Sequence, residues 1–177
     1  MAIGGAEAIE RLEAGHADLT AAVASLTSRQ IVRPGTLGGG DWSVKDLIGH
    51  IGAWERRALT IVDAWSRGEP FDALIGVGAV DELNERGVAA TRQRTLRETR
   101  SDAAATHRAL VERIAGLTAA DLRSSVTMST GRRHRLGTLL GSTTGGPAGP
   151  YLHMSAHLPD VRAYVASTRT EGGTIAR

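Results

Sequence analysis

The sequence predicts an all-α protein, a four-helix bundle, and three observations support this fold class. Apolar residues recur at helical spacing in four long segments. No region shows the alternating pattern of a strand-rich domain, and aromatic residues make up only 3% of the chain. The length of 177 residues suits one domain with a single core. We therefore expect one domain over residues 1–177, with its core at about 6–168 and a frayed tail at 169–177.

The first two predicted helices follow from the spacing of their apolar residues. Residues 6–26 carry one apolar face: Ile9, Leu12, Leu19, Val23 and Leu26. The second helix is expected to begin after Ser43, which forms a capping-box pattern with Asp46, three residues later. Eight apolar residues between Val44 and Trp65 then form one stripe, so this segment is the clearest helix of the chain.

The third predicted helix covers 80–117, and we expect a break or bend near Gly87, because 38 residues is long for a globular helix. A basic stretch rich in Thr and Ser follows it. The segment GSTTGGPAGP, residues 141–150, is expected to be a loop because of its Gly and Pro content. The fourth helix is expected to begin near Tyr151 and to fade by Thr168.

Composition excludes several functions. The chain has no cysteine, so any thiol that takes part in its chemistry must come from outside. No secretory leader and no run of about 18 apolar residues is present, which predicts a soluble, cytoplasmic protein without membrane contact. The 21 basic residues are spread among 19 acidic ones, so nucleic acid is not an expected partner. The one compact basic cluster, GRRHR at 131–135, has two interpretations: a contact for phosphate or thiol-cofactor carboxylates, or a solvated turn between two extended segments.

Histidines provide the main candidate site. His153 and His157 lie four residues apart in the last predicted helix, so about 40° separates them around the helix axis. His50 lies at the edge of the apolar stripe of the second helix, where two packed helices can meet. Three neutral imidazoles hold a divalent metal and leave a position open for water or substrate. The alternative is that the pair is a surface accident, and spacing alone does not decide. The other three histidines are expected to be solvated or core residues: His16, His107 and His134.

One segment resembles a known family. GGGDWSVKDLIGHIGAWERRAL is similar to the signature of the DinB/YfiT-like superfamily, in which Gly-x-Trp-Ser-Val-Lys-Asp begins the second helix and a histidine two turns later ligates a metal. YLHMSAHLPDVRAY matches the other two ligands of that family. The segments AWSRGEP, VDELNERGVAATR and THRALVERIAGLTAADL resemble the ClbS/DfsB-type four-helix proteins. The resemblance spans about residues 6–168 and implies an up-down-down-up bundle with His50, His153 and His157 as the metal ligands.

The resemblance also implies a function. Family activities include transfer of thiols such as mycothiol or bacillithiol, thiol-dependent isomerisation and, in the ClbS type, hydrolytic opening of a strained cyclopropane. We therefore expect a metal-dependent enzyme that acts on a reactive electrophilic small molecule. It would use metal-activated water, as a hydrolase, or an external thiol, as a transferase or isomerase, in detoxification or natural-product self-resistance. The alternative is a non-catalytic protein that sequesters a small molecule. Zinc or nickel is the expected metal, mycothiol or another small thiol a candidate cofactor, and a homodimer is implied.

Two residues near the histidine pair are candidates for a catalytic role. Asp160 follows His157 by three positions and is a candidate acceptor that orients its ring, the alternative being a solvated helix acid. Tyr151 is a candidate proton donor to a leaving group, although its helical direction points away from the pair. Neither role follows from spacing alone.

Two further residues are candidates for a substrate pocket. Trp54 lies one turn beyond His50, where it can wall an apolar pocket or serve as a core residue. Asn84 opens the third predicted helix where the ClbS type also has Asn, so the resemblance implies that it faces the site. Helix capping and solvent exposure are the alternatives for Asn84.

Overall fold

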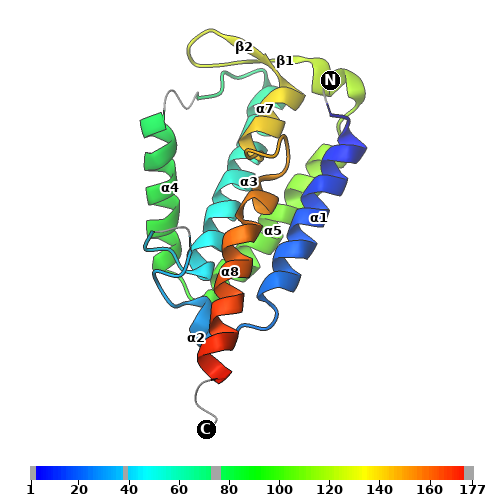
Figure 1. The fold of residues 1–177 in the computed structure, drawn as a ribbon. Coiled ribbons are helices and arrows are strands. Elements are labelled where there is room, and N and C mark those ends of the chain that lie inside the picture. Colours follow the sequence, from blue (N-terminus) through cyan, green and yellow to red (C-terminus); the bar gives the residue numbers. More distant parts are fainter. Residues whose placement is uncertain (1–2, 38–39, 73–76, 174–177) are drawn as a thin grey trace.

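The computed structural model describes residues 3–37, 40–72 and 77–173. Long helices lie side by side, with a small hairpin across one end (Figure 1). Four helices form the bundle: α1 (Gly5–Val23), α3 (Val44–Arg67), α5 (Leu96–Ala115) and α8 (His153–Gly173). The remaining elements are α2 (Ser28–Ile31), α4 (Val77–Arg92), α6 (Ala119–Arg123), β1 (Ser125–Thr127), β2 (Arg133–Arg135) and α7 (Leu136–Thr143). Among the described residues, no helix is long and apolar enough to cross a membrane.

The bundle has the predicted up-down-down-up topology. In Figure 1, α1 and α8 run in one direction, and α3 and α5 run in the other. Because α3 and α5 are parallel, the chain between them must return along the bundle. Helix α4 makes this return and packs against α3. The prediction of an all-α four-helix bundle is therefore confirmed.

The expected break in the third predicted helix is present, but it lies at residues 93–95 and not near Gly87, which lies inside α4. A Cβ atom at Gly87 would lie 3.4 Å from Ala53 Cβ, so the glycine serves close packing of α4 on α3. The helix ends instead at Arg92, and α5 starts after a capping box in which the Thr95 side chain accepts from the Glu98 backbone N–H. A capping box marks the residue at which a helix begins, so it locates this boundary better than the isolated glycine does.

Two other predicted boundaries differ from the structure. Helix α7 extends through Thr143, so the Gly- and Pro-rich segment is a loop only from residue 144 onward. Helix α8 begins at His153 rather than at Tyr151, because Tyr151 has a left-handed backbone (φ 61°) that an α-helix cannot contain. At the other end, α8 continues to Gly173, and residues 174–177 of the expected tail lie outside the described residues.

The basic cluster 131–135 forms β2 and the turn before it. Strands β1 and β2 pair antiparallel, with Ser125 opposite Arg135. Gly131 has a left-handed φ of 78°, and its N–H donates to Met128 O at 2.8 Å, which closes the turn. The arginines of the cluster are exposed. The structure therefore has the turn between two extended segments that was one of the two interpretations.

The buried core divides into two clusters along the bundle. One includes Ile61 of α3, Leu110 of α5 and Leu136 of α7. The other includes Leu47 and Ile51 of α3 together with residues of α1 and α8. Near the boundary between them, α3 carries two buried polar side chains, His50 and Glu55, which are 4% and 2% exposed. Buried polar groups of this kind require partners, so they mark where function is to be sought.

Close contact between α3 and α4 depends on Gly49, the neighbour of His50. A Cβ atom at this position would lie 2.8 Å from Thr91 Cβ, and it would also meet the Thr91 hydroxyl. Rotation of the threonine side chain does not relieve a clash with its own Cβ, so α4 would have to shift. We expect Gly49→Ala to lower the free energy of unfolding by about 1–3 kcal/mol, measured by urea denaturation.

A matched control and a rescue test this prediction. Gly78 lies in α4 with no atom within 4 Å of a built Cβ, so Gly78→Ala is expected to be neutral or slightly stabilising. Adding Thr91→Gly to Gly49→Ala should recover part of the lost stability, because it removes the clashing atoms. Equal stability of Gly49→Ala and the wild type would contradict the packing argument.

Candidate metal centre

Three histidine rings meet at the seam between α3 and α8. His50 comes from α3, and His153 and His157 come from successive turns of α8. The Nε2 atoms of His50 and His153 are 3.0 Å apart, and those of His153 and His157 are 3.3 Å apart. The three possible ligand atoms all lie within 4.8 Å of one another. The structure thus brings together the three side chains that the sequence singled out.

Local structure on both helices positions the rings. The Ser43–Asp46 capping box is formed as predicted and fixes the start of α3, two turns before His50. On α8, the backbone N–H of His153 donates to Thr144 O at 3.0 Å, which ties the first turn of the helix to the end of α7. A Cβ atom at Gly146 would lie only 2.8 Å from Ala156 Cβ, so the loop can approach this turn because it is glycine-rich.

The three imidazoles are held in their neutral form. Burial lowers the pKa of His50 to about 2, and the neighbouring charges of His153 and His157 act in the same direction. Burial, followed by the charge of His157, lowers the pKa of His153 to about 4. Burial also lowers the pKa of His157, opposed by the charge of Asp160. At neutral pH the site therefore presents unprotonated nitrogens instead of imidazolium ions.

This donor set fits a divalent metal ion. Zinc binds imidazole nitrogen at about 2.0–2.1 Å, so two ligands of a tetrahedral site lie about 3.3 Å apart. The His50–His153 and His153–His157 separations of 3.0 and 3.3 Å are close to that value, and the third separation is within 4.8 Å. One N–H proton can bridge only two of the neutral imidazoles, by donating to the bare nitrogen of the other ring. A divalent cation would accept an electron pair from all three rings at once. His50, His153 and His157 would be its ligands.

Aromatic rings surround the three histidines. The Trp42 ring lies 4.8 Å from the His50 ring, measured between centroids. The Trp54 ring lies 6.4 Å from that of His50 and 6.0 Å from that of His153. Trp54 Nε1 donates to Asn84 Oδ1 at 2.9 Å, which joins α3 to α4 beside the site. Trp54 and Asn84 are thus near the triad. Sequence reasoning missed Trp42, although it is the tryptophan of the Gly-x-Trp-Ser-Val-Lys-Asp motif.

Tyr151 and Asp160 have other surroundings. Tyr151 is 2% exposed, its hydroxyl donates to Gly137 O at 3.2 Å, and burial raises its pKa to about 12. Asp160 is exposed, and among the described residues it forms no hydrogen bond with His157. It acts on that ring only through its charge. The structure therefore adds no contact in support of a catalytic role for either residue.

A second polar cluster lies across α3 from the triad, and the sequence did not indicate it. His107 Nδ1 of α5 donates to Glu55 Oε1 of α3 at 2.8 Å. The His107 ring stacks on that of His16 of α1, with centroids 4.4 Å apart. One signal was available, because Glu55 lies one turn after Ile51 on the apolar stripe of its helix. An acid in such a position predicts a buried carboxylate with a partner.

The family match and the fold together place the chain among the DinB/YfiT-like helical proteins. Residues 12–141 match the model of the family described as mycothiol maleylpyruvate isomerase N-terminal domain, and the chain belongs to this family. The matched residues include His50 and end before His153 and His157. A comparison with curated proteins found no significant match.

Solved structures confirm the fold. An uncharacterised protein from Escherichia coli UTI89 superposes with a TM-score of 0.77 at 13% identity, over 94% of this chain and 95% of that one. A mycothiol-dependent maleylpyruvate isomerase gives 0.66 at 12% identity, over 90% of this chain and 61% of the isomerase. The Sibling Lethal Factor Precursor, DfsB, gives 0.60 at 15% identity, over 98% of each chain. At these identities the similarity concerns the fold alone.

Proposed function

We propose that the protein is a metal-dependent enzyme that adds or exchanges a low-molecular-weight thiol, mycothiol or a close chemical relative, on a reactive electrophilic small molecule. The observation that carries the proposal is the convergence of three neutral imidazole nitrogens at the α3–α8 seam. Membership of the mycothiol maleylpyruvate isomerase N-terminal domain family supports the thiol as the nucleophile in preference to water. The chain has no cysteine, so the thiol must be external.

Each part of the site has a role in this proposal. When bound, a divalent cation with three imidazole ligands favours the deprotonated form of a coordinated thiol or water. His50, His153 and His157 hold that cation. Trp42 and Trp54 present apolar rings beside the ligands, which limits access of bulk water and suits an apolar substrate. Asn84 fixes the Trp54 ring through its hydrogen bond.

The proposal also covers the metal, the cellular role and the oligomeric state, for which the support is the family resemblance and the three imidazole ligands. Zinc or nickel is the metal, because three imidazoles suit both. The protein acts in the cytoplasm, in detoxification or self-resistance, and forms a homodimer. Hydrolysis by metal-activated water is the second activity to assay, because the same three ligands support it.

Metal analysis followed by a turnover assay tests the proposal. Protein purified without a His tag is expected to contain near-stoichiometric zinc or nickel by mass spectrometry. With mycothiol and an electrophile such as maleylpyruvate, it should convert many equivalents of substrate, and removal of the metal by a chelator should stop the reaction. Consumption that saturates at one equivalent would indicate a sequestering protein. Absence of metal, with none taken up from added zinc or nickel, would overturn the metal site.

A further inference from the structure

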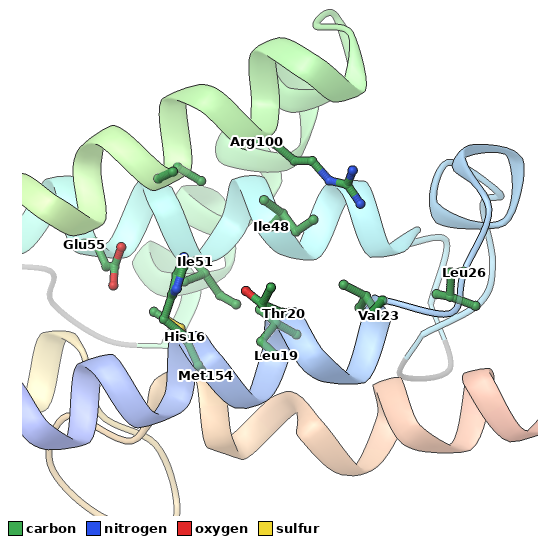
Figure 2. Close-up of a pocket in the computed structure, with 13 residues that line it drawn as sticks. His16, Leu19, Thr20, Val23, Leu26, Ile48, Ile51, Glu55, Arg100 and Met154 are labelled. Atoms are coloured by element: carbon green, nitrogen blue, oxygen red, sulfur yellow. The ribbon is translucent and has the colours of Figure 1, made fainter.

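A cavity opens between α1 and α5. Figure 2 shows this crevice, with α3 behind it and α8 below. Its volume is about 510 Å³, within the range of small-molecule sites, and none of the three triad histidines lines it. Its walls are mostly apolar: Leu19, Val23, Leu26, Ile48, Ile51 and Met154.

One end of the crevice contains a buried acid. Glu55 lines the cavity and is 2% exposed, and Figure 2 places its carboxylate at this end beside His16. Oε1 accepts the hydrogen bond from His107. Within the described part of the chain, no residue donates to Oε2. Oε2 is therefore an acceptor that a hydrogen-bond donor bound in the crevice can reach.

His16 adds a second polar group to the same end. Its ring lines the crevice and stacks on His107, and it forms no hydrogen bond with any described residue. Burial and the neighbouring charge of His107 lower the pKa of His16, against the effect of Glu55. The ring is therefore neutral at pH 7, and one of its nitrogens can accept a hydrogen bond.

We infer that the α1–α5 crevice is a second small-molecule site, for an apolar compound whose N–H or O–H group donates to Glu55 Oε2. The apolar walls take up the body of the compound, and the Glu55–His16 end selects its polar head. Chemical complementarity supports this occupant, because the polar end offers acceptor atoms on Glu55 and His16 while the walls offer apolar contact. The site goes beyond the proposed function, since it needs neither the metal nor the thiol.

Binding of three matched probes to metal-free protein tests the inference. Toluene, p-cresol and 4-methylbenzylamine share one apolar body and differ in the head group. Titrations followed by NMR chemical shifts of α1 and α5 should show p-cresol or 4-methylbenzylamine binding about tenfold or more tightly than toluene, the usual effect of a hydrogen bond to a charged group. The tighter of the two polar probes identifies a hydroxyl or an amine as the preferred head. Equal binding of all three probes, or no binding, would overturn the inference.

Substitutions in and beside the crevice test whether the probes bind there. Ala104 lines the crevice and Ala105, on the same helix, is exposed. Ala104→Phe should fill the cavity and abolish binding, while Ala105→Phe should leave it unchanged. Glu55→Met removes both carboxylate oxygens, so it should remove most of the preference for the polar probes over toluene. Unchanged binding in Ala104→Phe, or a preserved head-group preference in Glu55→Met, would place the probes elsewhere and refute the site.

Discussion

Replacing His153 with alanine is expected to abolish metal binding. His153 is the middle member of the triad, because its Nε2 lies 3.0 Å from that of His50 and 3.3 Å from that of His157. Its loss leaves two ligands on different helices with a gap between them. Loss of a residue that only hydrogen-bonds to a metal ligand weakens metal affinity about 10–100-fold. Loss of the ligand itself should therefore weaken the affinity by about 100-fold or more. Competition with a chromogenic chelator and metal mass spectrometry give the affinity and the content.

His134→Ala is the matched control. His134 is half-buried in the β1–β2 hairpin, paired with Val126, and is not one of the three converging residues. This variant should keep the metal content and affinity of the wild type. Circular dichroism should show unchanged helix in both variants, because neither substitution breaks a helical hydrogen bond. Equal metal content in the two variants would mean that the metal is bound outside the triad.

The fold could be predicted largely from local signals. The apolar stripe of α3 and its Ser43–Asp46 capping box both lie where the sequence placed them. The boundary between α4 and α5 was predicted at the wrong place, because it lies at the Thr95–Glu98 capping box and Gly87 is accommodated inside α4. The start of α8 was missed because the left-handed conformation of Tyr151 is set by tertiary contacts, including its N–H bond to Gly141 O. Local patterns therefore identify helices better than they locate the residues between them.

The candidate site was predictable only in part. The spacing of His153 and His157 implies one face of one helix, but the meeting of their rings with His50 depends on how α3 and α8 pack. The family resemblance supplied that step. The pairing of Glu55 with His107 had no such help, because it joins two helices 52 residues apart in sequence. Buried polar pairs of this kind depend on tertiary structure, and a single sequence reveals at most one partner.

Acid is expected to destabilise the metal-free protein well above the pH at which carboxylates titrate. The pKa of His50 is lowered to about 2 and that of His153 to about 4, against an ordinary value of 6.5. Above pH 6.5 both histidines are mostly neutral in the folded and unfolded chains. As far as these two groups are concerned, the free energy of unfolding is therefore at its maximum there. Below it the unfolded chain takes up protons that the folded chain does not, and the free energy of unfolding falls by up to about 1.4 kcal/mol per pH unit for each histidine.

Urea denaturation of chelator-treated protein at several values between about pH 7.5 and pH 5 measures this loss, in a window above most carboxyl pKa values. The slope should be smaller in His153→Gln, which removes one of the two groups, and unchanged in His134→Ala. Saturating zinc should shift the acid transition to lower pH, because the metal binds only the neutral imidazoles of the folded state. A free energy of unfolding that is the same at both ends of the window would contradict neutral burial of the triad. The same result would remove the electrostatic reason for a metal at the α3–α8 seam, so the acid profile tests the site independently of any substrate.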